Sequence, residues 1–259
     1  MLPEGTTAVR EGTFYWMLLA MWFVLAIAAF FALLVKPAPY GRFSESAWGP
    51  KLPPRIAWLL MEGPAAVLFS LLFLFGTHKN AVAVAFFAIW NIHYVYRGFI
   101  YPCLTRSTRS VPMTIVASAI CFQVVNSYLQ ARWLFALGPE YPLSWLSGAC
   151  FICGVSLFFV GMAITISSDA ILRSLRSPGD NLYHIPHGGL FRWISCPNYF
   201  GEILEWSAWA ILTWSPAGLA FAVWTAANLV PRAISHHRWY HKTFSDYPVK
   251  RKAVIPFVL

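Results

Sequence analysis

Residues 14–35 read FYWMLLAMWFVLAIAAFFALLV and contain no charged side chain. A helix needs about 20 mostly apolar residues to cross the hydrocarbon core of a bilayer, and this run is long enough. The run is also too long for the apolar core of a signal peptide, and no small-residue cleavage site follows it. We therefore expect a first membrane span over residues 13–35.

Six further apolar segments follow the first one. They are residues 55–76, 81–104, 112–135, 145–168, 199–214 and 216–232. Over the whole chain 58% of the residues are apolar and 11% are charged, whereas about a quarter of a soluble domain is charged. The sequence therefore predicts an all-α, polytopic integral membrane protein. We expect one membrane-embedded domain over residues 1–259, built as a bundle of seven transmembrane helices with a tail at 233–259.

The basic residues gather on one side of the predicted bundle. Fifteen of the 19 Lys and Arg residues lie in three connections and the tail, which are residues 36–55, 104–111, 169–198 and 232–259. The opposite side holds Arg10, Lys79 and Arg132. Because cytoplasmic loops carry the excess of Lys and Arg, we expect the C-terminus in the cytoplasm and the N-terminus outside or in the lumen. This topology accounts for the net charge of +9 without nucleic acid as a partner.

Several familiar motifs are absent from the sequence. It has neither the Gly-rich dinucleotide turn nor the phosphate loop, so side chains of the bundle would have to hold any nucleotide. The five cysteines are odd in number and four lie in apolar runs, which favours packing over disulfides. Most of the seven histidines are scattered over different segments, and we expect no metal site.

Two ionisable side chains lie at similar depth in neighbouring segments. Glu62 lies about 12 Å from the cytoplasmic end of the second segment, and Tyr94 about 15 Å from that of the third. Such residues are costly in a membrane and point to function. A carboxyl beside a phenol can hold or donate a proton to a substrate oxygen. Alternatively, Glu62 could be an interhelical hydrogen-bond partner, and Arg97 could snorkel to the surface.

Further polar stripes lie near the predicted cytoplasmic ends. The sixth segment carries Asn198, Glu202 and Glu205 at helical spacing. The other polar residues are Asp169, Arg173 and Arg176 after the fifth segment, and Arg232, His236 and Tyr240 at the end of the seventh. The sequence therefore predicts one polar cavity that opens to the cytoplasm.

Six stretches of the chain carry a resemblance to a known family. They are AWLLMEGP at 57–64, His93-Tyr94 through Arg97 to Tyr101, SDAILRSLRSPG at 168–179, IPHGGLF at 185–191, NYFGEILEW at 198–206, and HHRWY at 236–240 with Asp246-Tyr-Pro248. The chain resembles the steroid 5α-reductases (3-oxo-5α-steroid 4-dehydrogenases) from about residue 35 to its end. The resemblance implies NADPH-dependent reduction of the Δ4 double bond of 3-oxo-Δ4 steroids, with hydride added at C5 and a proton at C4.

The resemblance also implies roles for individual residues. Glu62 and Tyr94 would bind the 3-oxo group of the substrate. The NADPH pocket would be lined by Tyr40, Arg97, Arg106, Asp169, Arg173, Arg176, Asn198, Glu202, Arg232, His236 and Tyr240. The expected partners are the lipid bilayer and an apolar steroid, and no obligatory protein partner is evident. We expect a bacterial homologue in the inner membrane, or an endoplasmic reticulum protein if the source is eukaryotic, with the active site toward the cytoplasm.

Three positions depart from the family pattern. Met61 stands where the family has Gln, and Thr165 and Ser167 stand where it has Asn and His. The first change would loosen recognition of the 3-oxo group, and the others would alter contacts to the nicotinamide. None of them touches Glu62 or Tyr94, so the reaction class is retained.

Other functions remain open from the sequence. Enoyl-thioester and polyprenol reductases would differ only in substrate. Isoprenylcysteine carboxyl methyltransferases have a similar C-terminal region but use S-adenosylmethionine, which has no phosphate to pair with Arg97, Arg173 and Arg176. A lipid transporter would be expected to show inverted repeats with broken helices at the midplane, and the sequence shows none.

Overall fold

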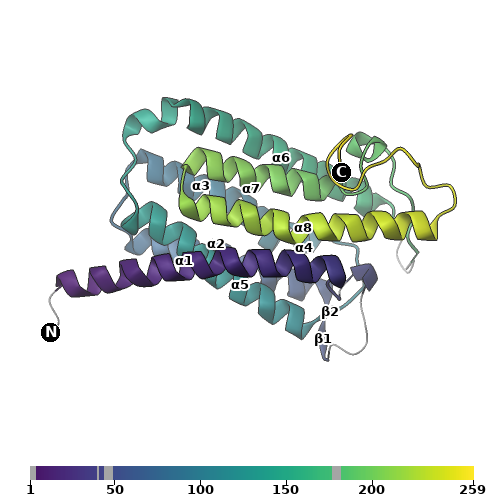
Figure 1. The fold of residues 1–259 in the computed structure, drawn as a ribbon, viewed down its shortest axis with the longest axis horizontal. Coiled ribbons are helices and arrows are strands. Elements are labelled where there is room, and N and C mark those ends of the chain that lie inside the picture. The colour runs from purple at the N-terminus through teal and green to yellow at the C-terminus, as the bar shows by residue number, and fades with distance from the viewer. Residues whose placement is uncertain (1–3, 40, 44–48, 177–181) are drawn as a thin grey trace.

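The computed structural model describes residues 4–39, 41–43, 49–176 and 182–259. Its long helices run side by side in one bundle (Figure 1). They are α1 (Glu4–Val35), α2 (Pro54–Phe75), α3 (Ala81–Val95), α5 (Met113–Arg132), α6 (Ala149–Ser174), α7 (Pro197–Thr213) and α8 (Pro216–Thr243). The fold is therefore almost entirely helical, as predicted.

Two of these helices continue through a wider, π-helical turn. Helix α3 passes through η3 (Tyr96–Ile100) into α4 (Tyr101–Leu104), and α5 passes into η4 (Trp133–Leu137). Short 3-10 helices lie at η1 (Gly41–Phe43), η5 (Leu143–Ser147) and η6 (Gly189–Arg192). Strands β1 (Lys51–Leu52) and β2 (Val111–Pro112) pair antiparallel. This small ribbon and the C-terminus lie at the end of the bundle opposite the N-terminus (Figure 1).

Each of the seven predicted segments coincides with a helix or a helix continued by a π-helical turn. Five helices of the described residues are long and apolar enough to cross a membrane, namely those at Arg10–Val35, Pro54–Phe75, Met113–Leu137, Ala149–Ser174 and Pro216–Thr243. A multi-pass helical membrane protein is thus confirmed. The number of seven spans and the orientation of the termini stay predictions.

Two helices extend well beyond the predicted segments. Helix α6 continues to Ser174 rather than ending near residue 168, and α8 continues to Thr243 rather than ending near 232. Both extensions carry polar side chains that the bundle buries, such as Asp169 and Tyr240. A helix can continue past its apolar run when tertiary contacts satisfy its polar residues. The length of the apolar run therefore underestimated the lengths of α6 and α8.

Aromatic side chains fill the centre of the bundle. Trp90 of α3 is fully buried and stacks on Phe69 of α2, with ring centroids 4.5 Å apart. The ring centres of Trp206 and Trp209 in α7 lie 5.5 and 5.4 Å from that of Trp90. Such pairs each contribute about 0.5–1.5 kcal/mol beyond their buried area. They fix α2, α3 and α7 around the point where the polar residues converge.

Close backbone contacts at glycines set the spacing of the helices that carry the polar residues. A Cβ on Gly161 of α6 would lie 2.6 Å from the carbonyl oxygen of Gly201 in α7. Likewise a Cβ on Gly98 in η3 would lie 2.9 Å from the backbone nitrogen of Gly63 in α2. Small residues at helix interfaces are typical of membrane bundles. The second contact places Glu62 and Arg97, one residue before each glycine, close to each other.

Candidate active site

Three side chains from three helices meet inside the bundle. Gln123 of α5 donates from Nε2 to Glu62 Oε2 of α2 over 3.0 Å. The hydroxyl of Tyr94 in α3 donates to Gln123 Oε1 over 3.3 Å. Tyr94 and Gln123 are both buried. Glu62 and Tyr94, which the sequence placed at similar depth, therefore lie at opposite ends of one amide group.

Arg97 is the centre of a second buried group. Its Nη1 lies 2.9 Å from Asp169 Oδ2, and its Nη2 lies 3.6 Å from Glu202 Oε2. The guanidinium carbon also lies 5.0 Å and 4.7 Å from the ring centres of Trp58 and Tyr101. Arg97 is 8% exposed. It does not snorkel to the surface, because two carboxylates and two rings replace its water.

Three further polar contacts involve α6 and α7. Asn198 donates from Nδ2 to Asp169 Oδ1 over 3.3 Å, and its carbonyl oxygen accepts from the hydroxyl of Thr165 at 3.3 Å. His93 Nδ1 lies 2.6 Å from Glu205 Oε1 in a fully buried pair. Both Glu202 and Glu205 of the predicted stripe on α7 thus face a basic group of α3 or η3.

A third group lies where η1 and α8 meet the start of α7. Arg232 donates to the Tyr199 hydroxyl over 3.1 Å, and that hydroxyl lies 3.2 Å from His236 Nε2. Arg42 donates to the Tyr240 hydroxyl over 3.2 Å. The spacing of Arg232, His236 and Tyr240 along α8 therefore does place them on one inward side, as the stripe predicted.

Several buried polar atoms of these groups have no hydrogen-bond partner among the described residues. They are Nη1 of Arg42, Nη1 of Arg173, Nδ1 of His236 and Oε2 of Glu205. A buried donor or acceptor without a partner is costly, about 1–3 kcal/mol each. Three of the four are nitrogens at the basic end of the bundle. Their chemistry fits a polar, anionic ligand.

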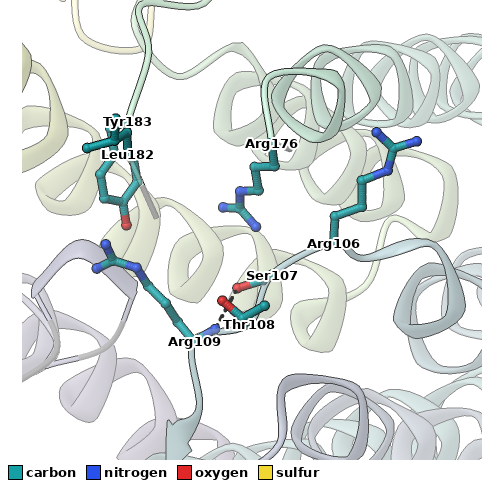
Figure 2. A pocket seen from close by; sticks show the side chains of 7 residues that line it. All are labelled: Arg106, Ser107, Thr108, Arg109, Arg176, Leu182 and Tyr183. Carbon is teal, nitrogen blue, oxygen red and sulfur yellow. Dashed lines mark hydrogen bonds between the residues drawn. The ribbon is translucent and has the colours of Figure 1, made fainter. Parts of the chain in front are cut away.

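A small, open surface hollow adjoins this end of the bundle. Figure 2 shows its lining, which consists of Arg106, Ser107, Thr108, Arg109, Arg176, Leu182 and Tyr183. The arginines come from the connection between α4 and β2 and from the residues after α6. The guanidinium of Arg109 lies 4.8 Å from the Tyr183 ring centre. Three guanidinium groups around one hollow suit phosphate groups.

The structure thus gathers most predicted site residues into neighbouring groups. Arg173 lies beside the Arg97 group, with its guanidinium carbon 5.9 Å from the Tyr101 ring centre. Arg106 and Arg176 line the hollow. Tyr40 falls outside the described residues.

Sequence reasoning missed three residues that the structure places in these groups. They are Gln123, Arg42 and Tyr199. A signal for the first was present, because Gln123, Asn126 and Gln130 recur at i, i+3 and i+7 along α5 and all are buried. Arg42 had no such signal, since it lies in a connection.

No group of three or more His, Cys, Asp or Glu side chains that could hold a metal ion occurs in the described part of the chain. Two of the departures from the family pattern also have a definite place. Thr165 bonds to the backbone of α6 and α7, and Met61 packs in an apolar cluster with Ala57, Val111 and Val116.

Comparison with known proteins identifies the family. The family model described as 3-oxo-5-alpha-steroid 4-dehydrogenase matches residues 109–259. The chain belongs to this family. It is 40% identical to steroid 5-alpha-reductase DET2 of Gossypium hirsutum, over 97% of this chain and 99% of that protein. The resemblance inferred from the sequence motifs is therefore confirmed.

Animal members of the family are equally similar to the chain. It is 39% identical to 3-oxo-5-alpha-steroid 4-dehydrogenase 1 of Rattus norvegicus, over 91% of this chain and 92% of that protein. It is 44% identical to 3-oxo-5-alpha-steroid 4-dehydrogenase 2 of the same species, over 87% and 89%. The likeness covers both the N-terminal helices that carry Glu62 and Tyr94 and the C-terminal half.

Proposed function

We propose that the protein is an NADPH-dependent reductase of 3-oxo-Δ4 steroids that forms 5α-dihydro-3-oxosteroids. The reaction adds hydride at C5 and a proton at C4. The observation that carries the proposal is the convergence of Glu62 and Tyr94 on one buried amide, next to a basic end suited to phosphates. Membership of the 3-oxo-5-alpha-steroid 4-dehydrogenase family supports the same reaction.

The Glu62–Gln123–Tyr94 group suits the charge that develops in this reaction. When hydride reaches C5, the electron pair of the C4–C5 double bond moves toward C3, and negative charge collects on the 3-oxo oxygen. The Tyr94 hydroxyl is a hydrogen-bond donor held in a buried site. A preorganised donor in such a site stabilises a developing oxyanion strongly. The charge then returns to C4, which takes up a proton.

The basic residues fit NADPH as the cofactor, which would supply the hydride. Three nitrogens, of Arg42, Arg173 and His236, have no hydrogen-bond partner among the described residues. They would find acceptors in its ribose and phosphate oxygens. The arginines around the surface hollow, Arg106 and Arg176 among them, would pair with phosphate groups, which guanidinium binds bidentately. Asp169, Asn198, Glu202, Arg232 and Tyr240 would complete the pocket.

The proposal includes the arrangement in the membrane. We place seven spans across the bilayer, with the basic end of the bundle, the hollow and the C-terminus in the cytoplasm and the N-terminus on the other side. Many large apolar side chains are exposed on the outside of the bundle, for instance Phe14, Val24 and Phe75. An apolar steroid would reach the site from the lipid, and NADPH from the cytoplasm.

The test is loss of NADPH absorbance by the purified protein in detergent or lipid, with progesterone or testosterone added and the product analysed by mass spectrometry. We expect the steroid to gain two hydrogens at the expense of NADPH and not of NADH. Absence of NADPH oxidation with every steroid would overturn the substrate assignment. Enoyl-thioesters and polyprenols would then be the next substrates to test.

Single substitutions test the assignment of the oxyanion donors. Tyr94→Phe and Glu62→Gln should lower turnover by about a hundred- to a thousandfold and leave NADPH binding within about twofold. Tyr96→Phe is the matched control, because the Tyr96 hydroxyl has no hydrogen-bond partner among the described residues. If Tyr94→Phe lowered turnover no more than Tyr96→Phe does, the assignment would be wrong.

A further inference from the structure

The amide of Gln123 occupies a central place in the proposed site. It is 6% exposed, and each of its two polar atoms contacts a different proposed donor. Nε2 donates to Glu62 Oε2 over 3.0 Å, and Oε1 accepts from the Tyr94 hydroxyl over 3.3 Å. No other polar contact of this side chain occurs among the described residues, so both ends of the amide serve the proposed site.

We propose that Gln123 is a positioning residue that couples Glu62 to Tyr94 and sets the direction of their protons. The inference rests on the proposed function of those two residues. An amide has a donor end and an acceptor end, so it fixes which neighbour donates and which accepts. Because Nε2 donates to Glu62 Oε2, a proton held by Glu62 lies on Oε1, the other carboxyl oxygen.

The observed arrangement also determines what has to change when a substrate oxygen arrives. Tyr94 has one hydroxyl hydrogen, and here it is directed at Gln123 Oε1. To donate to the 3-oxo oxygen, Tyr94 must release that contact. A half-turn of the amide would place Nε2 against the Tyr94 oxygen and Oε1 against a protonated Glu62. The chain of donors would then run from Glu62 through Gln123 and Tyr94 to the substrate, with every hydrogen bond retained.

Helix α5 provides a matched control for a purely structural role. Gln130 lies seven residues after Gln123 and is fully buried. It donates to the Ala217 carbonyl oxygen over 2.6 Å and accepts from Trp209 Nε1 over 2.9 Å. Gln130 therefore uses both ends of its amide in the same way, but joins α5 to α7 and α8 instead of joining the proposed donors.

The experiment compares Gln123→Met with Gln130→Met, since methionine keeps the length of the side chain and removes both polar ends. Misplacement of catalytic groups by about 1 Å can cost about a hundredfold in rate. We therefore expect Gln123→Met to lower kcat about 10- to 100-fold, with NADPH affinity changed less than about twofold. Gln130→Met should lower thermal stability at least as much and leave the kcat of the folded fraction within about twofold.

A double variant provides the decisive reading. Once Tyr94→Phe has removed the donor that Gln123 serves, adding Gln123→Met should cause less than about a threefold further loss, because residues that act as a unit are not additive. Independent, multiplicative losses would overturn the inference. So would Gln123→Met with normal kcat while Tyr94→Phe is inactive, and in that case the proposed function would stand.

The same variants also distinguish a wrong assignment of the donors from a folding defect of Gln123→Met. If Tyr94→Phe and Glu62→Gln both retained turnover, the proposed donors themselves would be wrong, whatever Gln123→Met did. If Gln123→Met failed to fold, Gln123→Glu would replace it, because a carboxyl keeps an acceptor for Tyr94 but removes the amide donor to Glu62. Gln123→Glu should fall between wild type and Tyr94→Phe in kcat, and wild-type kcat would contradict the inference.

Discussion

Replacing Arg97 by methionine is expected to destabilise the protein more than loss of any exposed ion pair. Arg97 lies 2.9 Å from Asp169 and 3.6 Å from Glu202, and its side chain is 10% exposed. The side chains of the two carboxylates are 6% and 23% exposed. Arg97→Met keeps most of the aliphatic packing but leaves two carboxyl groups without their guanidinium partner in a site with little water.

The expected size follows from this burial. Removing one partner of a buried ion pair typically costs about 3–5 kcal/mol, because the remaining charge is uncompensated. Methionine also loses the cation–π contacts to Trp58 and Tyr101. The pair of Arg132 with Glu11 is a natural comparison, since its side chains are 20% and 33% exposed. Arg132→Met should cost less than Arg97→Met, because a partly exposed pair is better solvated and contributes less than a buried one.

The assay is equilibrium unfolding in detergent micelles, followed by tryptophan fluorescence. The variants are Arg97→Met, Arg132→Met and Asp169→Asn, and the double variant that combines Arg97→Met with Asp169→Asn. In the Asp169→Asn background, Arg97→Met should cost clearly less, because one of its two carboxylate partners is already neutral. Equal losses for Arg97→Met and Arg132→Met, or full additivity with Asp169→Asn, would refute the reasoning.

Three more predictions test the helix interface, a buried thiol and the hollow. Gly201→Ala should prevent folding, since its Cβ would lie 2.6 Å from a backbone oxygen of α6. The Cβ of Gly63→Ala would meet no atom nearer than 3.6 Å, so that variant should fold, and expression yield and size-exclusion profile measure the difference. Burial raises the pKa of the Cys196 thiol to about 12, although the charge of Arg42 acts in the opposite direction. At pH 8 only about one thiol in ten thousand is then ionised, so maleimide should label Cys196 far more slowly in the folded protein than after unfolding. Arg176→Met should weaken NADPH binding about tenfold in a fluorescence titration with little change in the KM for the steroid, and an unchanged affinity would separate the hollow from the cofactor site.

The membrane fold could be predicted from the sequence because lipid imposes a simple rule. Every spanning helix needs a long apolar run, and such runs are visible without knowledge of their neighbours. The same rule says nothing about the π-helical turns at Tyr96–Ile100 and Trp133–Leu137. Their hydrogen-bond pattern differs by one residue from that of an α-helix, while their composition does not differ. The first of them carries Arg97, so a local feature hidden in the apolar pattern shapes the site.

The site could be predicted within one helix but not between helices. The stripe of Arg232, His236 and Tyr240 follows from helical periodicity, and the structure places the three side chains in one group. The contact between Gln123 and Glu62 depends instead on how α5 is rotated about its axis relative to α2. That rotation results from the whole packing of the bundle. Polar residues in one helix therefore indicate a functional side, and their partners emerge only from the fold.

The departure at Met61 shows why single positions of a family pattern are a limited guide. Residues 61 and 62 are consecutive and so point to different sides of α2. Met61 packs with Ala57 and Val116 in an apolar cluster, whereas Glu62 turns toward the amide of Gln123. A glutamine at position 61 would bring a second amide into that apolar cluster and would not take over the contact to Glu62 in this packing. The hydrogen bond that Glu62 accepts from Gln123 therefore comes from α5, at a position 61 residues away in the chain.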